Sequence, residues 1–306
     1  MAASDRDERL RAAAFAYLDS LRNRHGDRLT TQQLSEFEFE GTRLSLLQHM
    51  RGIRVVSGLE AAISIRTTYA ARPEDRPYED VEGSDGYLRY KWQGSDPDAY
   101  DNSALRRALE LGRPLVYFMA IAPGQFVALY PVWLVGEEAA EHQFVVAIDE
   151  TLRGQWEDAA FPHPADVALR REYAEQSVRV RLHQRAFRER VLLAYRGQCS
   201  LCRLRHLELL DAAHIKEDSD GGEPVVPNGL AMCAIHHRAF DAQVLGVRPD
   251  FVVEIRSDVL EERDGPTLMH ALQGVHGKSL SLPQRRAARP DRLLLEERYE
   301  RFRLAG

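Results

Sequence analysis

The sequence predicts an α+β protein with two parts, a mixed helical and β-sheet region followed by a smaller ββα unit near the C-terminus. Three observations support this fold class. The 306 residues exceed one typical small domain, and the hydrophobic content of 44% is enough for packed cores. Strand-like patterns dominate residues 58–152, whereas helical spacing marks both ends of the chain. All three cysteines fall within residues 199–233.

Residues 1–57 are expected to form a helical N-terminal element. A helix is predicted over residues 5–24, because apolar side chains recur there at helical spacing until Gly26 ends the run. A second short helix is expected to begin at Thr30 or Thr31. Strand-like segments follow, and they leave two alternatives open: a winged-helix-like element or a simple packing subdomain.

Residues 58–152 are expected to form a β-rich domain, a curled sheet with one helix laid on it. Glycine, proline and acidic residues separate the apolar runs, as turns do between strands. The helix is predicted over residues 101–112, with Asp101, Asn102 or Ser103 as its cap and Gly112 as its end. The expected strands lie within residues 61–69, 86–94, 114–122, 125–136 and 142–149.

A linker is expected over residues 153–176, which begin with a proline-containing stretch of no clear period. The C-terminal domain would then occupy residues 177–306. Outside the cysteine window, its expected elements are a strand at 177–182, a helix at 183–195, a strand at 250–255 and a closing helix at 290–302.

Composition limits the functional classes. The net charge is -6, no apolar run approaches membrane-spanning length, and the charged first residues do not resemble a secretory signal, so a cytoplasmic protein is expected. Between Arg170 and Arg205 stand ten arginines and three acidic residues. Such a local basic stripe is compatible with DNA binding, although charge alone favours a solvated helix face.

The cysteines predict a structural zinc site. Cys199 and Cys202 have the spacing Cys-x-x-Cys, and Cys233 and His236 have the spacing Cys-x-x-His. An odd number of cysteines argues against a set of disulfides, whereas two such pairs are the closed tetrahedral ligand set of structural zinc. A redox pair or a plain knuckle remains the alternative for an isolated Cys-x-x-Cys.

Other polar residues are interleaved with this zinc set. His214 ends an apolar run that predicts the first strand of a hairpin, and Asn228 begins the second strand after a long loop. His237 and Asp241 are four residues apart, which places them on one face of the helix that follows Cys233.

These residues, in the strings AAHI, NGLAMC and HHRAFD, resemble the HNH endonuclease superfamily, also called the His-Me finger nucleases. More narrowly they resemble actinobacterial McrA-like enzymes that depend on 5-methylcytosine, and the nuclease resemblance covers about residues 183–303. It implies that His214 is the general base, that Asn228 holds His214, and that His237 binds a catalytic Mg²⁺ or Mn²⁺ ion.

One position departs from the family. Many members place a metal-binding aspartate or histidine directly before the base, and here that position is Ala213. Asp211 and Asp241 are therefore the candidate carboxylate ligands of the catalytic ion.

The resemblance implies a type IV restriction enzyme that hydrolyses phosphodiester bonds in foreign methylated DNA, with the first half as reader of the modified base. Two reading modes stay open, base flipping into a concave β domain and contact in the major groove. A reader needs aromatic and cationic side chains, although strand aromatics are more often core and strand cations more often solvent-facing. The candidate DNA-binding residues are Arg66, Tyr69, Arg89 and Trp92.

Several alternatives remain. The nuclease could respond to phosphorothioate, 6-methyladenine or hydroxymethylcytosine, or the chain could be a non-catalytic zinc-containing protein that only binds DNA. A toxin is a further alternative, for which the sequence offers no delivery segment. The expected partner is double-stranded DNA with a modified base. Because one HNH unit cuts one strand, a double-strand break needs either a homodimer or two visits by a single unit.

Overall fold

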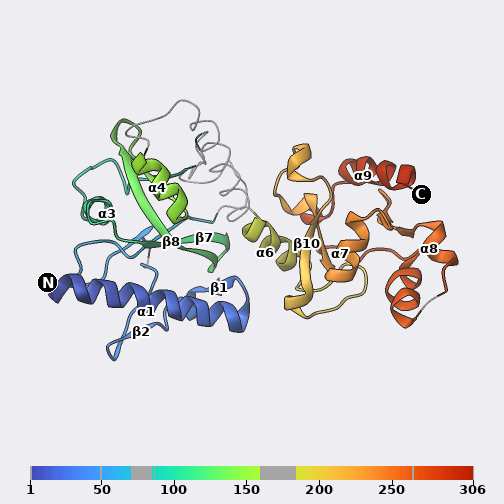
Figure 1. Ribbon diagram of the computed structural model, residues 1–306, viewed down its shortest axis with the longest axis horizontal. Helices are drawn as coiled ribbons and strands as arrows, with labels where there is room; N and C mark the ends of the chain where they lie inside the picture. Colours follow the sequence, from blue (N-terminus) through green and yellow to red (C-terminus); the bar gives the residue numbers. More distant parts are fainter. Residues whose placement is uncertain are drawn as a thin grey trace. The chain divides into compact units, whose positions relative to one another are not determined.

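The computed structural model describes residues 2–48, 50–69, 85, 87–158, 184–263 and 265–305. The chain divides into two compact units, Met1–Arg185 and Ala186–Gly306, here called the N-terminal unit and the C-terminal unit (Figure 1). Helix α4 (Glu150–Asp158) occupies the first residues of the expected linker. The rest of that linker and the strand expected at 177–182 lie outside the described residues.

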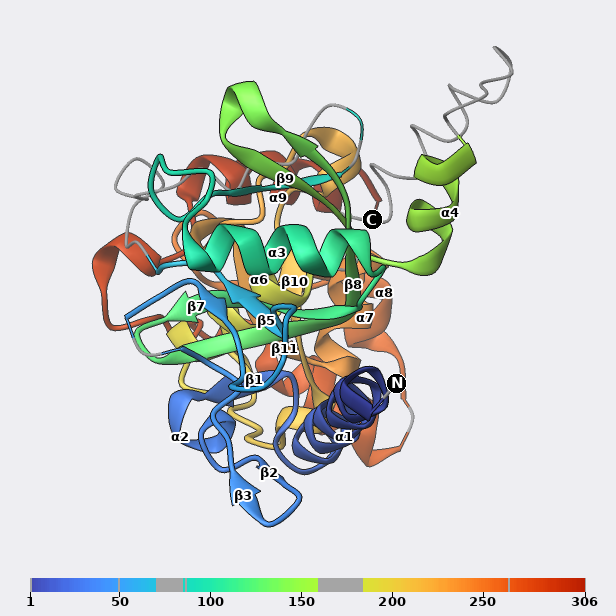
Figure 2. The ribbon, with the colours of Figure 1, turned by 90° about the vertical axis from the view of Figure 1, so that its left-hand side faces the viewer.

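A seven-stranded sheet organises the N-terminal unit (Figure 2). Its long strand β8 pairs with β7 and β1 through its first half and with β9 through its second half. Only β5 and β7 run parallel among the paired strands described. The order is β4 (Ile53–Arg54), β5 (Ser64–Arg66), β7 (Leu115–Ala122), β8 (Gln125–Glu138), β9 (Gln143–Ala147) and β6 (Leu88–Lys91), with β1 (Arg28–Thr30) beside β8.

Each face of this sheet has its own hydrophobic core. Successive strand side chains point to opposite faces, so Tyr117 belongs to one core and Phe118 to the other. Helix α1 (Ala2–His25) supplies the core on the Phe118 side, and α3 (Tyr100–Glu110) contributes to the core on the Tyr117 side, as the two sides of the sheet in Figure 1 show. The aromatic and β-branched runs of the sequence are thus buried on both sides.

Residues 1–57 and 58–152 share one structure. Strand β1 pairs with β8, placing Leu29 opposite Phe126, and both residues lie in the core that α1 covers. The second short helix, α2 (Thr31–Leu34), begins at Thr31. Thr30 precedes it as the N-cap, and its side chain forms a capping box with Gln33. A small hairpin of β2 (Glu38–Phe39) and β3 (Thr42–Arg43) follows.

The cap expected for helix α3 is wrong. The helix begins at Tyr100 after Ala99, which makes no side-chain capping bond. Asn102 lies inside the helix and is fully buried, where its side chain accepts a hydrogen bond from the Gln93 amide and donates to the Asp96 carbonyl. The asparagine therefore ties down the preceding loop, a task that the sequence pattern alone does not distinguish from capping.

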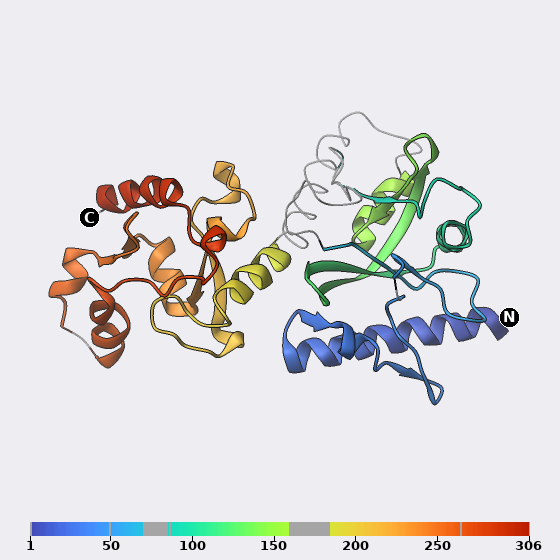
Figure 3. The same cartoon turned by 180° about the vertical axis from the view of Figure 1, so that it is seen from behind.

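A ββα arrangement forms the centre of the C-terminal unit (Figure 3). The hairpin strands pair so that Leu210 lies opposite Cys233 and His214 opposite Gly229. The remaining elements pack around this centre into a second core. In chain order the elements are α6 (Gln184–Ala194), β10 (Leu210–His214), β11 (Gly229–Cys233), α7 (Ala234–Asp241), β12 (Leu245–Val247), β13 (Val253–Ile255), α8 (Ser257–Glu261) and α9 (Arg292–Ala305).

Among the described residues, no helix is both long enough and apolar enough to cross a membrane.

Candidate active site and metal cluster

The structure brings Cys199, Cys202, Cys233 and His236 together. Their ligand atoms all lie within 4.8 Å of one another. The Nδ1 atom of His236 is 3.4 Å from the sulfur of Cys199 and 3.1 Å from that of Cys233, and the sulfurs of Cys202 and Cys233 are 3.9 Å apart. Tetrahedral zinc with its usual bond lengths separates neighbouring ligand atoms by roughly 3.5–3.8 Å, so this cluster could hold zinc.

The sulfurs of the cluster change one another's protonation. The adjacent Cys233 thiol lowers the pKa of Cys199 to about 3, and the same contact raises the pKa of Cys233. Three sulfurs this close oppose one another as thiolates, and a divalent cation removes that conflict. On the far side of the ring, Nε2 of His236 lies 2.7 Å from the Ala271 carbonyl oxygen. Donation to that oxygen leaves Nδ1 free to act as a ligand.

His214 stands at the end of β10, and an aromatic ring supports it from one side. Its ring stacks on Phe187 of α6, with centroids 4.0 Å apart and planes 17° apart. Gly229, opposite His214, makes room for the Phe187 ring, since a Cβ atom at residue 229 would stand 2.8 Å from that ring. Burial lowers the pKa of His214, which favours the neutral imidazole that a general base requires.

His237 lies between two carboxylates. Its Nδ1 is 3.4 Å from Asp211 Oδ2, and its Nε2 is 3.4 Å from Asp241 Oδ2. The hydrogen bond with Asp211 raises the pKa of His237. Since the carboxylates stand at opposite ring nitrogens, an ion bound to one nitrogen can be shared with only one of them. The other carboxylate would then orient the ring, as partners of metal-binding histidines commonly do.

The two adjacent histidines face different surroundings because successive residues of a helix are turned by about 100°. His236 is fully buried in the Cys3His cluster, whereas the His237 side chain is 24% exposed beside Asp211 of β10.

Asn228 does not hold His214 directly through its side chain. Its Oδ1 accepts a hydrogen bond from the Lys216 amide, and its Nδ2 donates to the carbonyls of Lys216 and Glu223. Asn228 precedes β11 by one residue and so lies opposite the chain that leaves β10. It therefore fixes the loop after His214, while its own carbonyl accepts a bond from Ile215.

The candidate DNA-reading residues have dissimilar surroundings. Trp92 is 5% exposed and stacks on His142, and the Arg89 guanidinium pairs with Asp85 and Glu138. Arg66 and Tyr69 lie at the surface, where the Arg66 Nε donates to the Arg51 carbonyl and Tyr69 is 37% exposed.

Sequence reasoning missed two residues near the site, Phe187 and Arg298. Phe187 carries no distinguishing signal, because it follows the apolar face of its helix. Arg298 does carry one: a cation stands between Leu295 and Phe302 in the buried stripe of α9.

Residues 199–248 match the family model described as HNH endonuclease. Nine solved chains match, and one of two examples is named "Modification dependent TagI restriction endonuclease". It is 16% identical, covers 82% of this chain and 85% of its own, and has a TM-score of 0.31. The other, the type IV phosphorothioation-dependent restriction endonuclease ScoMcrA, is 16% identical, covers 63% of this chain and 48% of its own, and has a TM-score of 0.25.

This chain thus spans about half the length of ScoMcrA. A search of curated proteins found no match. The family match defines the class of the site: the C-terminal unit contains an HNH endonuclease domain, with a Cys3His cluster that could hold zinc.

Proposed function

We propose that the protein is a modification-dependent DNA endonuclease that hydrolyses phosphodiester bonds in foreign DNA, with 5-methylcytosine as the modification. One observation carries the catalytic half of this proposal. Asp211, on the strand that ends in His214, lies 3.4 Å from His237 of α7, and the charges of both Asp211 and His237 act on the His214 ring.

In this proposal His214 accepts the proton of the attacking water. The Phe187 stack holds the ring, and burial keeps the imidazole neutral near pH 7. Asn228 keeps the loop beyond His214 in place through Lys216 and Glu223.

His237, with Asp211 or Asp241, would hold a Mg²⁺ or Mn²⁺ ion, and the charge and oxygen preference of such an ion fit these donors. When bound, the ion supplies Lewis-acid stabilisation of the scissile phosphate and the leaving oxygen. Cys199, Cys202, Cys233 and His236 would hold a structural zinc ion that sets the start of α7.

The N-terminal unit is the proposed reader of the modified base in double-stranded DNA. Of the four residues expected to bind DNA, Arg66 and Tyr69 offer accessible cationic and aromatic groups. Trp92 would support these groups from the core, and Arg89 would do so through its ion pairs with Asp85 and Glu138. Because one HNH site cuts one strand, a double-strand break requires a homodimer or two binding events.

The test is cleavage of one plasmid prepared with 5-methylcytosine, 6-methyladenine, hydroxymethylcytosine or phosphorothioate, and without modification. Each substrate is incubated with Mg²⁺, Mn²⁺ or Co²⁺. We expect cleavage of the 5-methylcytosine plasmid and none of the unmodified plasmid, and His214→Ala should abolish it. Equal cleavage of every plasmid would refute modification dependence, and cleavage that survives His214→Ala would refute the catalytic assignment.

A further inference from the structure

Arg298 is a buried cation in the apolar stripe of α9. Leu295, Arg298 and Phe302 are the buried residues of this helix, and Arg298 is 4% exposed. Arginine is rarely buried to this extent unless its charge is paired. Helix α9 also lies outside the residues that match the HNH family model, so the match assigns it no role.

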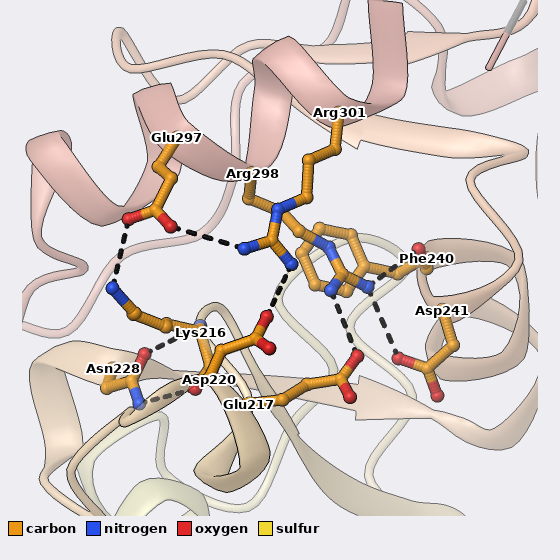
Figure 4. A network of polar contacts seen from close by, with 9 residues as sticks. All are labelled: Lys216, Glu217, Asp220, Asn228, Phe240, Asp241, Glu297, Arg298 and Arg301. Atoms are coloured by element: carbon orange, nitrogen blue, oxygen red, sulfur yellow. Dashed lines mark hydrogen bonds and ion pairs between the residues drawn. The ribbon is translucent and has the colours of Figure 1, made fainter. Parts of the chain in front are cut away.

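The Arg298 guanidinium joins two segments of the active site (Figure 4). One terminal nitrogen donates to Glu217, three residues beyond His214, at 3.2 Å. The other donates to the Phe240 carbonyl at 3.3 Å and lies 3.7 Å from Asp241 Oδ1, at the end of α7. The guanidinium also lies over the Phe240 ring, 4.7 Å from its centroid.

Asp241 bridges Arg298 and His237. Its Oδ1 faces Arg298, and its Oδ2 lies 3.4 Å from Nε2 of His237. A carboxylate on an exposed helix end is ordinarily free to change rotamer, and an arginine at one oxygen restricts where the other points.

Two further ion pairs join α9 to the loop between β10 and β11 (Figure 4). Glu297 pairs with Lys216, and Arg301 pairs with Asp220. The Lys216 and Arg301 side chains are 28% and 43% exposed, so water and salt weaken both pairs. Glu217 and Asp241 are exposed as well, at 56% and 43%. Arg298 differs because its own side chain is buried and is also held by the Phe240 carbonyl and ring.

Stability does not explain an arginine at this position. Burying a charge opposes folding, and replacing such a charge with a well-packed apolar side chain is often neutral or stabilising. The Arg298 Nε is itself buried without a hydrogen-bond partner among the described residues. An apolar side chain would complete the stripe between Leu295 and Phe302, yet it could not reach both Glu217 and Asp241.

We propose that Arg298 is a positioning residue of the nuclease site, which ties the loop after His214 to the end of α7 and sets the Asp241 carboxylate beside His237. This inference rests on the proposed function, in which His237 holds the catalytic ion. With its carboxylate fixed in this way, Asp241 either binds the catalytic ion together with His237 or orients the His237 ring that binds the ion.

The test compares Mn²⁺ binding by the full-length protein, measured by electron paramagnetic resonance, in wild type and Arg298→Lys. Lysine keeps the charge and loses the planar fork, so the comparison isolates geometry. We expect Mn²⁺ to bind about tenfold more weakly, the usual consequence of losing an orienting partner, and cleavage to recover at saturating Mn²⁺. The matched control is Arg303→Lys on the same helix. Arg303 pairs with Glu300 on the exposed surface, so this variant should leave Mn²⁺ affinity and cleavage unchanged.

Repeating Arg298→Lys in an Asp241→Asn background tests whether Arg298 affects Mn²⁺ binding through Asp241. If Arg298 acts through Asp241, its substitution there should change Mn²⁺ affinity less than twofold, because residues that share an interaction are not additive. Equal losses in both backgrounds would overturn the proposal. Should Arg298→Lys fail to fold, Glu217→Gln is the second variant, because it removes the charge of the exposed partner of Arg298. Glu217→Gln should also weaken Mn²⁺ binding, and unchanged binding would count against the proposal.

The two proposals can fail separately. Mn²⁺ binding that His237→Ala leaves intact would overturn the proposed function together with this inference. Mn²⁺ binding that depends on His237 but is unchanged in a folded Arg298→Lys variant would overturn the role of Arg298 alone.

Discussion

His236 and His237 are neighbours with different partners, and their substitution should separate folding from chemistry. His236→Ala removes a fully buried member of the Cys3His cluster, so zinc content and the unfolding temperature should both fall. His237→Ala removes a part-exposed side chain, so we expect the fold and zinc content to persist while cleavage is lost. Zinc analysis and thermal unfolding of both variants check this, and similar unfolding of the two would contradict it.

The pH dependence of cleavage should report His214. Burial lowers the pKa of its imidazole below the usual value of about 6.5, and only the neutral ring accepts a proton. Activity should therefore be lost as the pH falls through that lowered value, so at saturating Mn²⁺ the acidic midpoint is expected below pH 6.5. Rates across pH 5–8 measure it, with His206→Ala, at an exposed histidine, as control. A midpoint above pH 7 would rule the assignment out.

At the scale of elements, the loop between β10 and β11 depends on one glycine. A Cβ atom at Gly222 would stand 2.0 Å from the Lys216 carbonyl oxygen and 2.9 Å from Asn228 Nδ2. Gly222→Ala must displace this loop, and we expect it to lower the free energy of unfolding by about 1–3 kcal/mol and to reduce cleavage. Denaturant unfolding measures the first effect. Gly154→Ala, where a Cβ meets nothing within 4 Å, should not destabilise, and wild-type stability of Gly222→Ala would contradict the prediction.

Most helices and strands could be predicted from the sequence because their apolar residues follow the required periods. Helix α1, strand β7 and the hairpin that carries His214 are examples. The roles of Asn102 and Asn228 could not be predicted, since both bind backbone groups of loops whose path no periodicity specifies. The stack of Phe187 on His214 joins residues 27 positions apart and likewise leaves no local pattern.

At the scale of the whole molecule, the Cys3His cluster could be predicted because its residues form two pairs that are each close in sequence. The extent of the first domain could not be predicted. The sequence suggested a boundary near residue 57, and the pairing of Leu29 with Phe126 crosses it. Contacts between distant strands determine such boundaries, and a single sequence does not reveal them.

Metal removal should affect the two units differently. Among the described residues, the Cys3His cluster belongs to the C-terminal unit, so a zinc chelator should lower the unfolding temperature of that unit by more than about 10 °C. The N-terminal unit should unfold at an unchanged temperature. Differential scanning calorimetry with and without chelator checks both, and added Zn²⁺ rather than Mg²⁺ should restore the lost transition. A chelated protein shown to be zinc-free, yet with both transitions in place, would contradict the structural role.

The position of Phe187 under the His214 ring has a consequence for engineering. A fusion that transfers the cutting activity to another targeting domain would naturally take residues 199–248, the stretch that resembles other HNH enzymes. Such a graft would leave out Phe187 on α6, whose ring stacks on His214. The smallest transferable fragment should therefore start at residue 184, where α6 begins. It should extend to residue 305, the end of α9, because α9 carries Arg298.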